Sequence, residues 1–152
     1  MRFLLLFLLF IGVLFAWQGC KTQEVSFKDY KGPKLMFGEG GGFAGTVNEY
    51  IVFPNGQVFL KKNEGAAVVY GKIKKRKAKQ LFKKAIEMDL IKKSYKKPGN
   101  MYYYIGYKKD KEFSKSVWGR EQHLINEPLD SFFKDFFKIL PKSNSAGTSS
   151  SK

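Results

Sequence analysis

The sequence contains very few of the side chains that bind metals or perform catalysis. It has one cysteine, Cys20, and one histidine, His123, in 152 residues. A single thiol excludes any internal disulfide. One cysteine and one histidine also give no cluster with the spacing of metal ligands. We therefore expect no bound metal ion and no cofactor.

Other signatures of catalysis are missing as well. There is no G-x-S-x-G nucleophile elbow, and Glu39, Glu49 and Glu64 stand alone in expected strands or loops. A Ser-His-Asp arrangement stays open, because its members meet in space and not in sequence. Nothing else favours it, so we expect a protein without catalytic residues that acts by binding.

Acidic residues and arginine are both scarce. The chain has 28 Lys+Arg against 13 Asp+Glu, a formal net charge of +15. Such an excess attracts anions in general, including anionic lipid, acidic polysaccharide and nucleic acid. The only arginines are Arg2, Arg76 and Arg120, and the forked guanidinium is the group that reads bases and phosphates with defined geometry. The composition indicates diffuse attraction and argues against nucleic acid as the partner.

The densest basic cluster lies on the polar face of a predicted helix. It consists of Lys74, Lys75, Arg76, Lys77 and Lys79. This cluster is a candidate contact for an anionic surface, since a basic residue near an anionic membrane contributes about 1 kcal/mol. The alternative, which we favour, is a solvated helix face, because most charge runs lie on the surface.

Only one long apolar run is present, and it lies at the N-terminus. It extends from Phe3 to Trp17 behind the cationic start Met1-Arg2. A membrane-spanning helix needs about 20 apolar residues, whereas a cationic start before a shorter apolar segment is typical of a secretory signal. We interpret residues 1–19 as a signal peptide.

The apolar run ends in Trp17-Gln-Gly-Cys20, which resembles the end of a bacterial lipoprotein signal peptide. In that pattern a small residue, here Gly19, precedes the cysteine that is lipidated. The resemblance implies that Cys20 carries the lipid and anchors the protein in a membrane of the bacterial cell envelope. Trp17 and Gln18 match the pattern loosely. The alternative is a signal anchor with an incidental cysteine.

The rest of the chain suffices for one small domain with flexible ends. We expect a lipidated tether over residues 20–33, a single domain over 34–141 and a disordered, serine-rich tail over 142–152. The tail has no apolar residue larger than alanine, so burial cannot compensate for the entropy of ordering it. Within the tether, Phe27 and Tyr30 are the side chains expected to touch the domain.

Hydrophobic periodicity predicts strands, a helix, two more strands and a last helix. The expected strands are residues 35–37, 46–53, 57–60, 66–70, 101–107 and 112–118. The first expected amphipathic helix carries Lys75 and Arg76 on its polar face and ends near Leu90-Ile91, and the second spans residues 126–140. Asn55-Gly56 between apolar runs is a strong hairpin signal. Hairpins punctuated by helices argue for an α+β fold. We expect a small antiparallel sheet of hairpins with both helices packed on one face.

The alternation in residues 112–118 makes a finer prediction. Phe113 and Val117 share one face of this strand, while Ser114 and Ser116 share the other. The pattern predicts a mainly apolar face and a wet face that carries the serines up to the tryptophan at the end of the strand.

The segment Gly38–Gly45, GEGGGFAG, satisfies G-x-G-x-x-G from Gly40 onward but lacks the context of a nucleotide site. A dinucleotide loop opens directly into a helix, whereas Thr46–Phe53 is β-branched and aromatic. No Gly-Lys-Ser/Thr closes the run, which excludes a P-loop. The glycines instead predict a connection or bulge where positive φ or close approach of another chain is needed.

One resemblance covers residues 34–140. Gly41-Gly-Phe-Ala-Gly45, then an extended segment, a tight turn, a helix, a Tyr-rich strand, a basic strand and a last amphipathic helix resemble emfourin. Emfourin is a small bacterial protein inhibitor of thermolysin-like metallopeptidases. The resemblance implies a binding module whose partner is a metallopeptidase or another envelope protein. The implied contact loop consists of Gly40, Gly41, Gly42, Phe43, Ala44 and Gly45.

This chain departs from that family in being strongly basic and in carrying a lipoprotein-like N-terminus. The alternative function is therefore a structural envelope lipoprotein whose lysine-rich surface binds anionic lipid or polysaccharide.

Overall fold

The computed structural model describes residues 25–122 and 127–142. The strands are β1 (Lys34–Gly41), β2 (Thr46–Val52), β3 (Gln57–Lys62), β4 (Val68–Lys72), β5 (Lys96–Lys97), β6 (Met101–Lys109) and β7 (Glu112–Gly119). The helices are α2 (Lys75–Glu87) and α3 (Glu127–Ile139), with a 3-10 turn, η1, at Arg120–Gln122. The predicted signal peptide (1–19), Cys20, His123 and almost all of the predicted tail lie outside the described residues.

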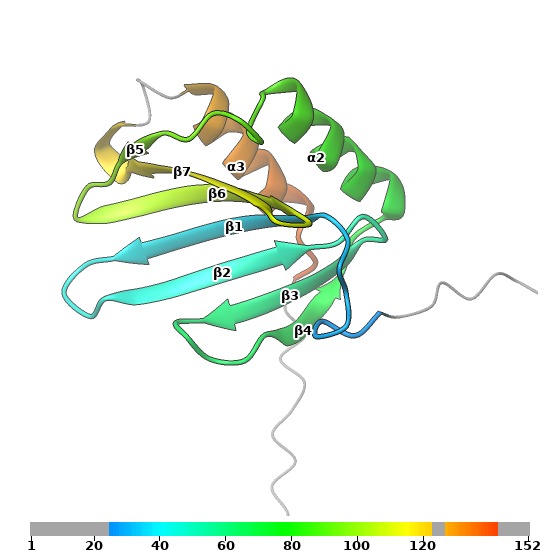
Figure 1. Ribbon diagram of the computed structural model, residues 1–152. Helices are drawn as coiled ribbons and strands as arrows, with labels where there is room; N and C mark the ends of the chain where they lie inside the picture. Colours follow the sequence, from blue (N-terminus) through cyan, green and yellow to red (C-terminus); the bar gives the residue numbers. More distant parts are fainter. Residues whose placement is uncertain (1–24, 123–126, 143–152) are drawn as a thin grey trace, which may run out of the picture.

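All the strands belong to one seven-stranded sheet with the order β4-β3-β2-β1-β6-β7-β5 (Figure 1). Every neighbouring pair is antiparallel except β5 and β7, which are parallel. The prediction of a small antiparallel sheet is therefore wrong. The fold is α+β in the coarse sense, but the sheet is large and mixed and dominates it.

Two local features explain why the size of the sheet was underestimated. Glycine is depleted in strands, so the pattern predicted an end at Phe37, whereas β1 continues to Gly41. The two lysines of β5 carry no apolar alternation and gave no strand signal. Because β1 pairs with β2 on one side and with β6 on the other, the glycine-rich strand lies at the centre of the sheet.

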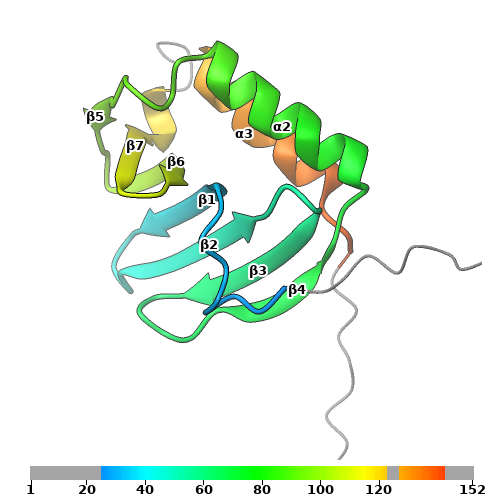
Figure 2. The same ribbon diagram turned by 45° about the vertical axis from the view of Figure 1, so that its right-hand side comes forward.

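Both helices lie side by side on the same face of the sheet (Figures 1 and 2). Their buried stripes are Ala78, Leu81, Phe82 and Ala85 in α2, and Phe132, Phe133 and Phe136 in α3. The ring of Phe37 in β1 stacks on Phe136 with centroids 4.0 Å apart. Lys84 of α2 donates to Asp135 of α3 at 3.1 Å. This layer is the main hydrophobic core.

α2 ends at Glu87, before the predicted end near Leu90–Ile91. Asp89 adopts a positive φ of 53°. The Leu90 N–H then donates to the Ala85 carbonyl at 3.1 Å. A left-handed residue followed by a hydrogen bond to the carbonyl five residues earlier is a Schellman motif. Glycine is the usual residue at the left-handed position, and because this position is Asp89, the sequence did not predict where the helix ends.

The predicted orientation of β7 is wrong. Trp118 and Ser116 are buried under the helix layer, whereas Phe113 is 58% exposed on the opposite face. The two serines hydrogen-bond protein groups and do not face solvent. The Ser114 hydroxyl donates to the Leu90 carbonyl, and the Ser116 Oγ accepts from the Tyr95 N–H at 3.2 Å. They hydrogen-bond the backbone of the segment after α2, and such a bond makes burial of a hydroxyl tolerable.

Neither α2 nor α3 covers the other face of the sheet (Figure 2), and we call it the open face. A second, smaller apolar cluster lies there, built on Ile51, Phe53 and Phe59. The first described residues cross this cluster: the Tyr30 ring stacks on Phe53 at 4.0 Å, and Phe27 packs against Phe59 at 5.2 Å.

Gln57 fixes this N-terminal segment. Its Oε1 accepts from the Val25 N–H at 2.9 Å, and its Nε2 donates to the Val25 carbonyl at 3.2 Å. The chain that follows the predicted lipidation site therefore enters the domain across the open face.

Candidate functional site

The glycines of β1 give room to aromatic rings on β6. Gly38 is paired with Tyr104, and Gly40 with Tyr102. A Cβ added at Gly38 would lie 2.0 Å from the Tyr104 ring, and one added at Gly40 would lie 2.9 Å from the Tyr102 hydroxyl oxygen. Tyrosine rings therefore cover the glycine backbone on the open face. This packing explains two of the glycines without any bound ligand.

Polar contacts hold Tyr104 in this position. Its hydroxyl donates to Glu49 Oε2 at 2.8 Å, and Lys115 Nζ lies 3.6 Å from the centre of its ring. Burial, and secondarily the Glu49 carboxylate, raise the pKa of Tyr104 well above its usual range. Burial lowers the pKa of Lys115, while Glu49 opposes that effect. The Glu49 carboxylate and the Lys115 ammonium thus both contact Tyr104 beside the glycine strand.

The end of β1 is braced against the start of β6. Gly41 has a φ of 101°, and a Cβ there would lie 2.0 Å from the Asn100 carbonyl oxygen. The same oxygen accepts from the Gly42 N–H at 2.9 Å. Only glycine combines this φ with such close approach of another backbone. The hairpin between β1 and β2 is therefore anchored at its base.

Beyond this brace, Gly42–Gly45 forms the turn from β1 to β2, which we call the hairpin tip. The Gly45 N–H donates to the Gly42 carbonyl at 3.1 Å, and both glycines have positive φ, 57° and 75°. Between them, Phe43 is fully exposed. A buried phenylalanine contributes about 1.5–3 kcal/mol relative to an exposed one, so this ring offers that energy to a partner.

The predicted contact loop divides into two parts. Gly40 and Gly41 belong to β1, and the Gly40 backbone is covered. Gly42, Phe43, Ala44 and Gly45 make the turn, in which the last three are exposed. The surface available to a partner is thus shorter than the predicted loop and is centred on one aromatic side chain.

The basic cluster falls at the start of α2. Lys74, Lys75, Arg76, Lys77 and Lys79 are all exposed, and none of them forms an ion pair with a described acidic residue. α2 has no acidic residue in its first turn, and Lys74 at the N-cap makes no side-chain capping bond. Positive charge at the positive end of a helix dipole is unfavourable, so this cluster favours an anion.

The described part of the chain contains no cluster of metal-ligating side chains. No group of three His, Cys, Asp or Glu side chains within residues 25–122 and 127–142 could hold a metal ion. Of the three acids considered from sequence, Glu49 is bound to Tyr104, and Glu64 is exposed in the β3–β4 connection. No helix of these ranges is long and apolar enough to cross a membrane.

Comparison with known proteins places the chain in no family. No protein-family model matches it, and no curated protein is significantly similar to it. The site must therefore be interpreted from its own geometry.

The structure also contains a groove that the sequence did not predict. A groove of about 900 Å³ lies on the open face, between the N-terminal segment and the β3–β4 connection. The residues that line it come from six separate segments of the chain. The only indication of the groove in the sequence was the alternation of side chains between the two faces of each strand. Without the strand order, that signal could not show which of these side chains share a face.

Proposed function

We propose that this protein is a non-catalytic binding module that is anchored in the bacterial cell envelope through Cys20 and docks a protein partner with its hairpin tip. The observation that carries the proposal is the fully exposed Phe43 on a turn whose base is fixed by the Gly42–Asn100 hydrogen bond. The partner class suggested by the resemblance to emfourin is a thermolysin-like metallopeptidase.

Preorganisation supports this function. A loop that is already held in its bound shape loses little conformational entropy on binding, and that saving appears directly as affinity. Here the positive φ values of Gly42 and Gly45 set the turn, and the contact with Asn100 holds it against β6. A projecting aromatic residue on such a turn suits the cleft of a peptidase, because hot spots are aromatic anchors that fill pockets.

The proposal is tested by progress curves of a thermolysin-like metallopeptidase with residues 21–152 as the inhibitor. Gly42→Asp is the disruptive variant, because aspartate at a φ of 75° is strained and its Cβ would lie 3.0 Å from the Met101 sulfur. We expect inhibition by the wild-type chain that persists from low to moderate salt and is weakened at least about tenfold in the variant. No inhibition by a folded wild-type domain would refute the peptidase as partner.

A second function is favoured by the uncapped, basic start of α2. In this second function the protein is a structural envelope lipoprotein. It binds anionic lipid or polysaccharide through Lys74, Lys75, Arg76, Lys77 and Lys79. Binding of this kind is diffuse and electrostatic, so it collapses between low and moderate salt. A contact that depends on the shape of the hairpin tip survives the same change, and salt therefore separates the two functions.

A further inference from the structure

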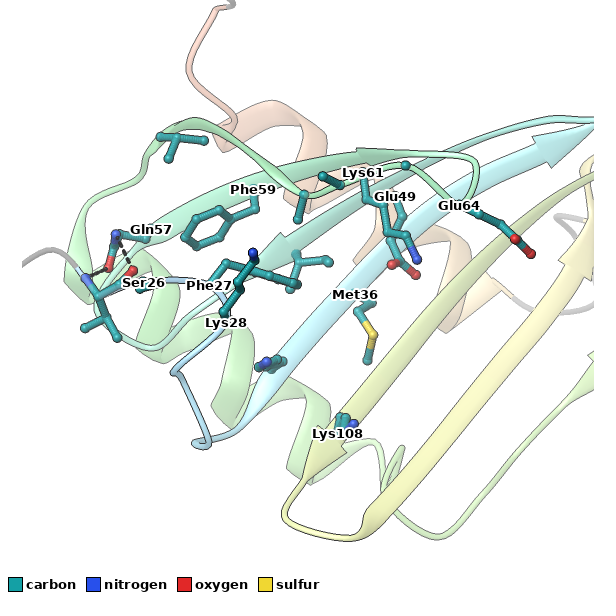
Figure 3. Close-up of a pocket in the computed structure, with 17 residues that line it drawn as sticks. Ser26, Phe27, Lys28, Met36, Glu49, Gln57, Phe59, Lys61, Glu64 and Lys108 are labelled. Atoms are coloured by element: carbon teal, nitrogen blue, oxygen red, sulfur yellow. Dashed lines mark hydrogen bonds between the residues drawn. The ribbon is translucent and has the colours of Figure 1, made fainter.

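The groove on the open face combines an apolar floor with basic walls (Figure 3). Met36, Ile51 and Phe59 come from β1, β2 and β3 and lie on the floor, and Phe27 of the N-terminal segment lies beside them. The cavity of about 900 Å³ lies within the range of about 300–1,000 Å³ that is usual for small-molecule sites.

Positive charge predominates around this floor. The lining contains four lysines, Lys28, Lys34, Lys61 and Lys108, and two glutamates, Glu49 and Glu64. The Glu49 carboxylate already accepts a hydrogen bond from Tyr104. None of the four lysines forms an ion pair with an acidic residue in the described ranges. The groove therefore has unneutralised cations next to apolar surface.

Two of these lysines lie opposite each other on neighbouring strands. Lys34 and Lys108 are direct partners on β1 and β6, and burial together with the Lys108 charge lowers the pKa of Lys34. The Lys34 ammonium lies 4.8 Å from the centre of the Phe27 ring, within the range of a cation–π contact. An anion between the two lysines would relieve their repulsion.

The groove lies close in sequence to the proposed anchor, because the segment that begins at Val25 lines it. Val25 lines the groove and is held by Gln57, and only five positions separate it from Cys20. A fully extended chain of that length reaches at most about 18 Å. A lipid on Cys20 would thus keep the open face within reach of the membrane surface.

We propose that this groove binds one anionic phospholipid of the anchoring membrane, with the lipid phosphate at Lys34 and Lys108 and part of an acyl chain on Met36, Ile51 and Phe59. A soluble anion would leave the apolar floor unused, and an apolar ligand would leave the lysines unneutralised. The membrane as the source of the lipid rests on the proposed anchoring at Cys20. The site does not involve the hairpin tip.

The test uses the full-length protein in nanodiscs with a photoactivatable phosphatidylglycerol, whose acyl chain carries a diazirine, followed by mass-spectrometric mapping. We expect labelling of peptides that contain Met36, Ile51 or Phe59. Lys34→Gln with Lys108→Gln should weaken labelling at least about tenfold, because each basic residue near an anionic lipid contributes appreciably. The matched control, Lys96→Gln with Lys97→Gln, removes the same charge from β5, an exposed edge strand outside the groove, and should have no effect.

A second variant pair, Lys61→Gln with Lys108→Gln, keeps the contact between Lys34 and Phe27 and should also reduce labelling. Equal labelling by a phosphatidylcholine probe would overturn the proposal. So would a loss of labelling in the β5 control variant, or displacement of the probe by an acidic peptide but not by anionic lipid. So would unchanged labelling in both groove variants.

A last arm separates this site from the proposed function. Dioctanoyl phosphatidylglycerol, which is dispersed in water, is titrated into residues 21–152 in detergent-free buffer, and peptidase inhibition by the same protein is measured in parallel. Binding of the short lipid without labelling in nanodiscs would refute the membrane as the source. Binding of neither lipid would refute the site. Inhibition reports on the hairpin tip and should be the same in the groove variants as in wild type.

Discussion

The two faces of the sheet use aromatic residues for different purposes. On the helix face, the rings of Phe37, Phe132 and Phe136 are fully buried against one another. On the open face, Tyr104 lies over a glycine and binds a carboxylate, while Phe113 remains largely exposed. The helix face holds the larger of the two buried clusters. The open face and its hairpin tip carry the groups that are free to meet a partner.

The largest expected difference between the faces is in stability. Phe136→Ala removes a ring from the packed helix layer and should lower the free energy of unfolding by about 3–5 kcal/mol. Phe113→Ala removes a ring of the same type from the open face and should change it by less than about 1 kcal/mol. Urea denaturation of both variants measures this. Equal losses would show that the open face also supports the fold.

A smaller loss of stability is expected at Gly38, which packs against the ring of Tyr104. Gly38→Ala places a Cβ inside the space of Tyr104 and should lower the free energy of unfolding by about 1–3 kcal/mol through overpacking. Because Glu49 and Lys115 hold the ring, it cannot move without losing these contacts. The double variant Gly38→Ala/Tyr104→Ser should recover part of the loss in a double-mutant cycle. Strictly additive effects would contradict the packing explanation.

The smallest effect is a dependence on alkaline pH. The pKa of Tyr104 is raised in the folded protein above its ordinary value of 10.0. The unfolded chain therefore releases this proton first as pH rises, and the stabilisation is complete below pH 10 and is lost above it. The stability advantage of wild type over Tyr104→Phe should shrink by about 1 kcal/mol between pH 9 and pH 11. Unfolding curves at both values check this, and a constant difference would contradict it.

Local patterns predicted several elements of the fold. Asn55-Gly56 predicted the β2–β3 hairpin, which is confirmed, with Gly56 at a φ of 95°. The stripe of α3 predicted the burial of Phe132 and Phe136, also confirmed. These signals succeed because each depends on residues that are close in sequence.

The remaining features depend on partners that are distant in sequence. β1 continues through its glycines because Tyr102 and Tyr104 of β6 cover them. The serines of β7 face inward because the segment after α2 supplies Leu90 and Tyr95 as hydrogen-bond partners. Composition could indicate neither the contact between β1 and β6 nor the contact between β7 and the segment after α2. For the candidate site, the glycine motif located the hairpin tip, while the division between strand and turn required the contact with Asn100.

The most direct test of the central claim compares two exposed phenylalanines in one assay. The inhibition constant against a thermolysin-like metallopeptidase is measured for Phe43→Ala and Phe113→Ala, both of which should remain as stable as wild type because each ring is exposed. We predict that Phe43→Ala raises the inhibition constant at least about thirtyfold, as expected for loss of an aromatic hot spot, and that Phe113→Ala leaves it unchanged. Equal inhibition by the two variants would contradict the role of the hairpin tip.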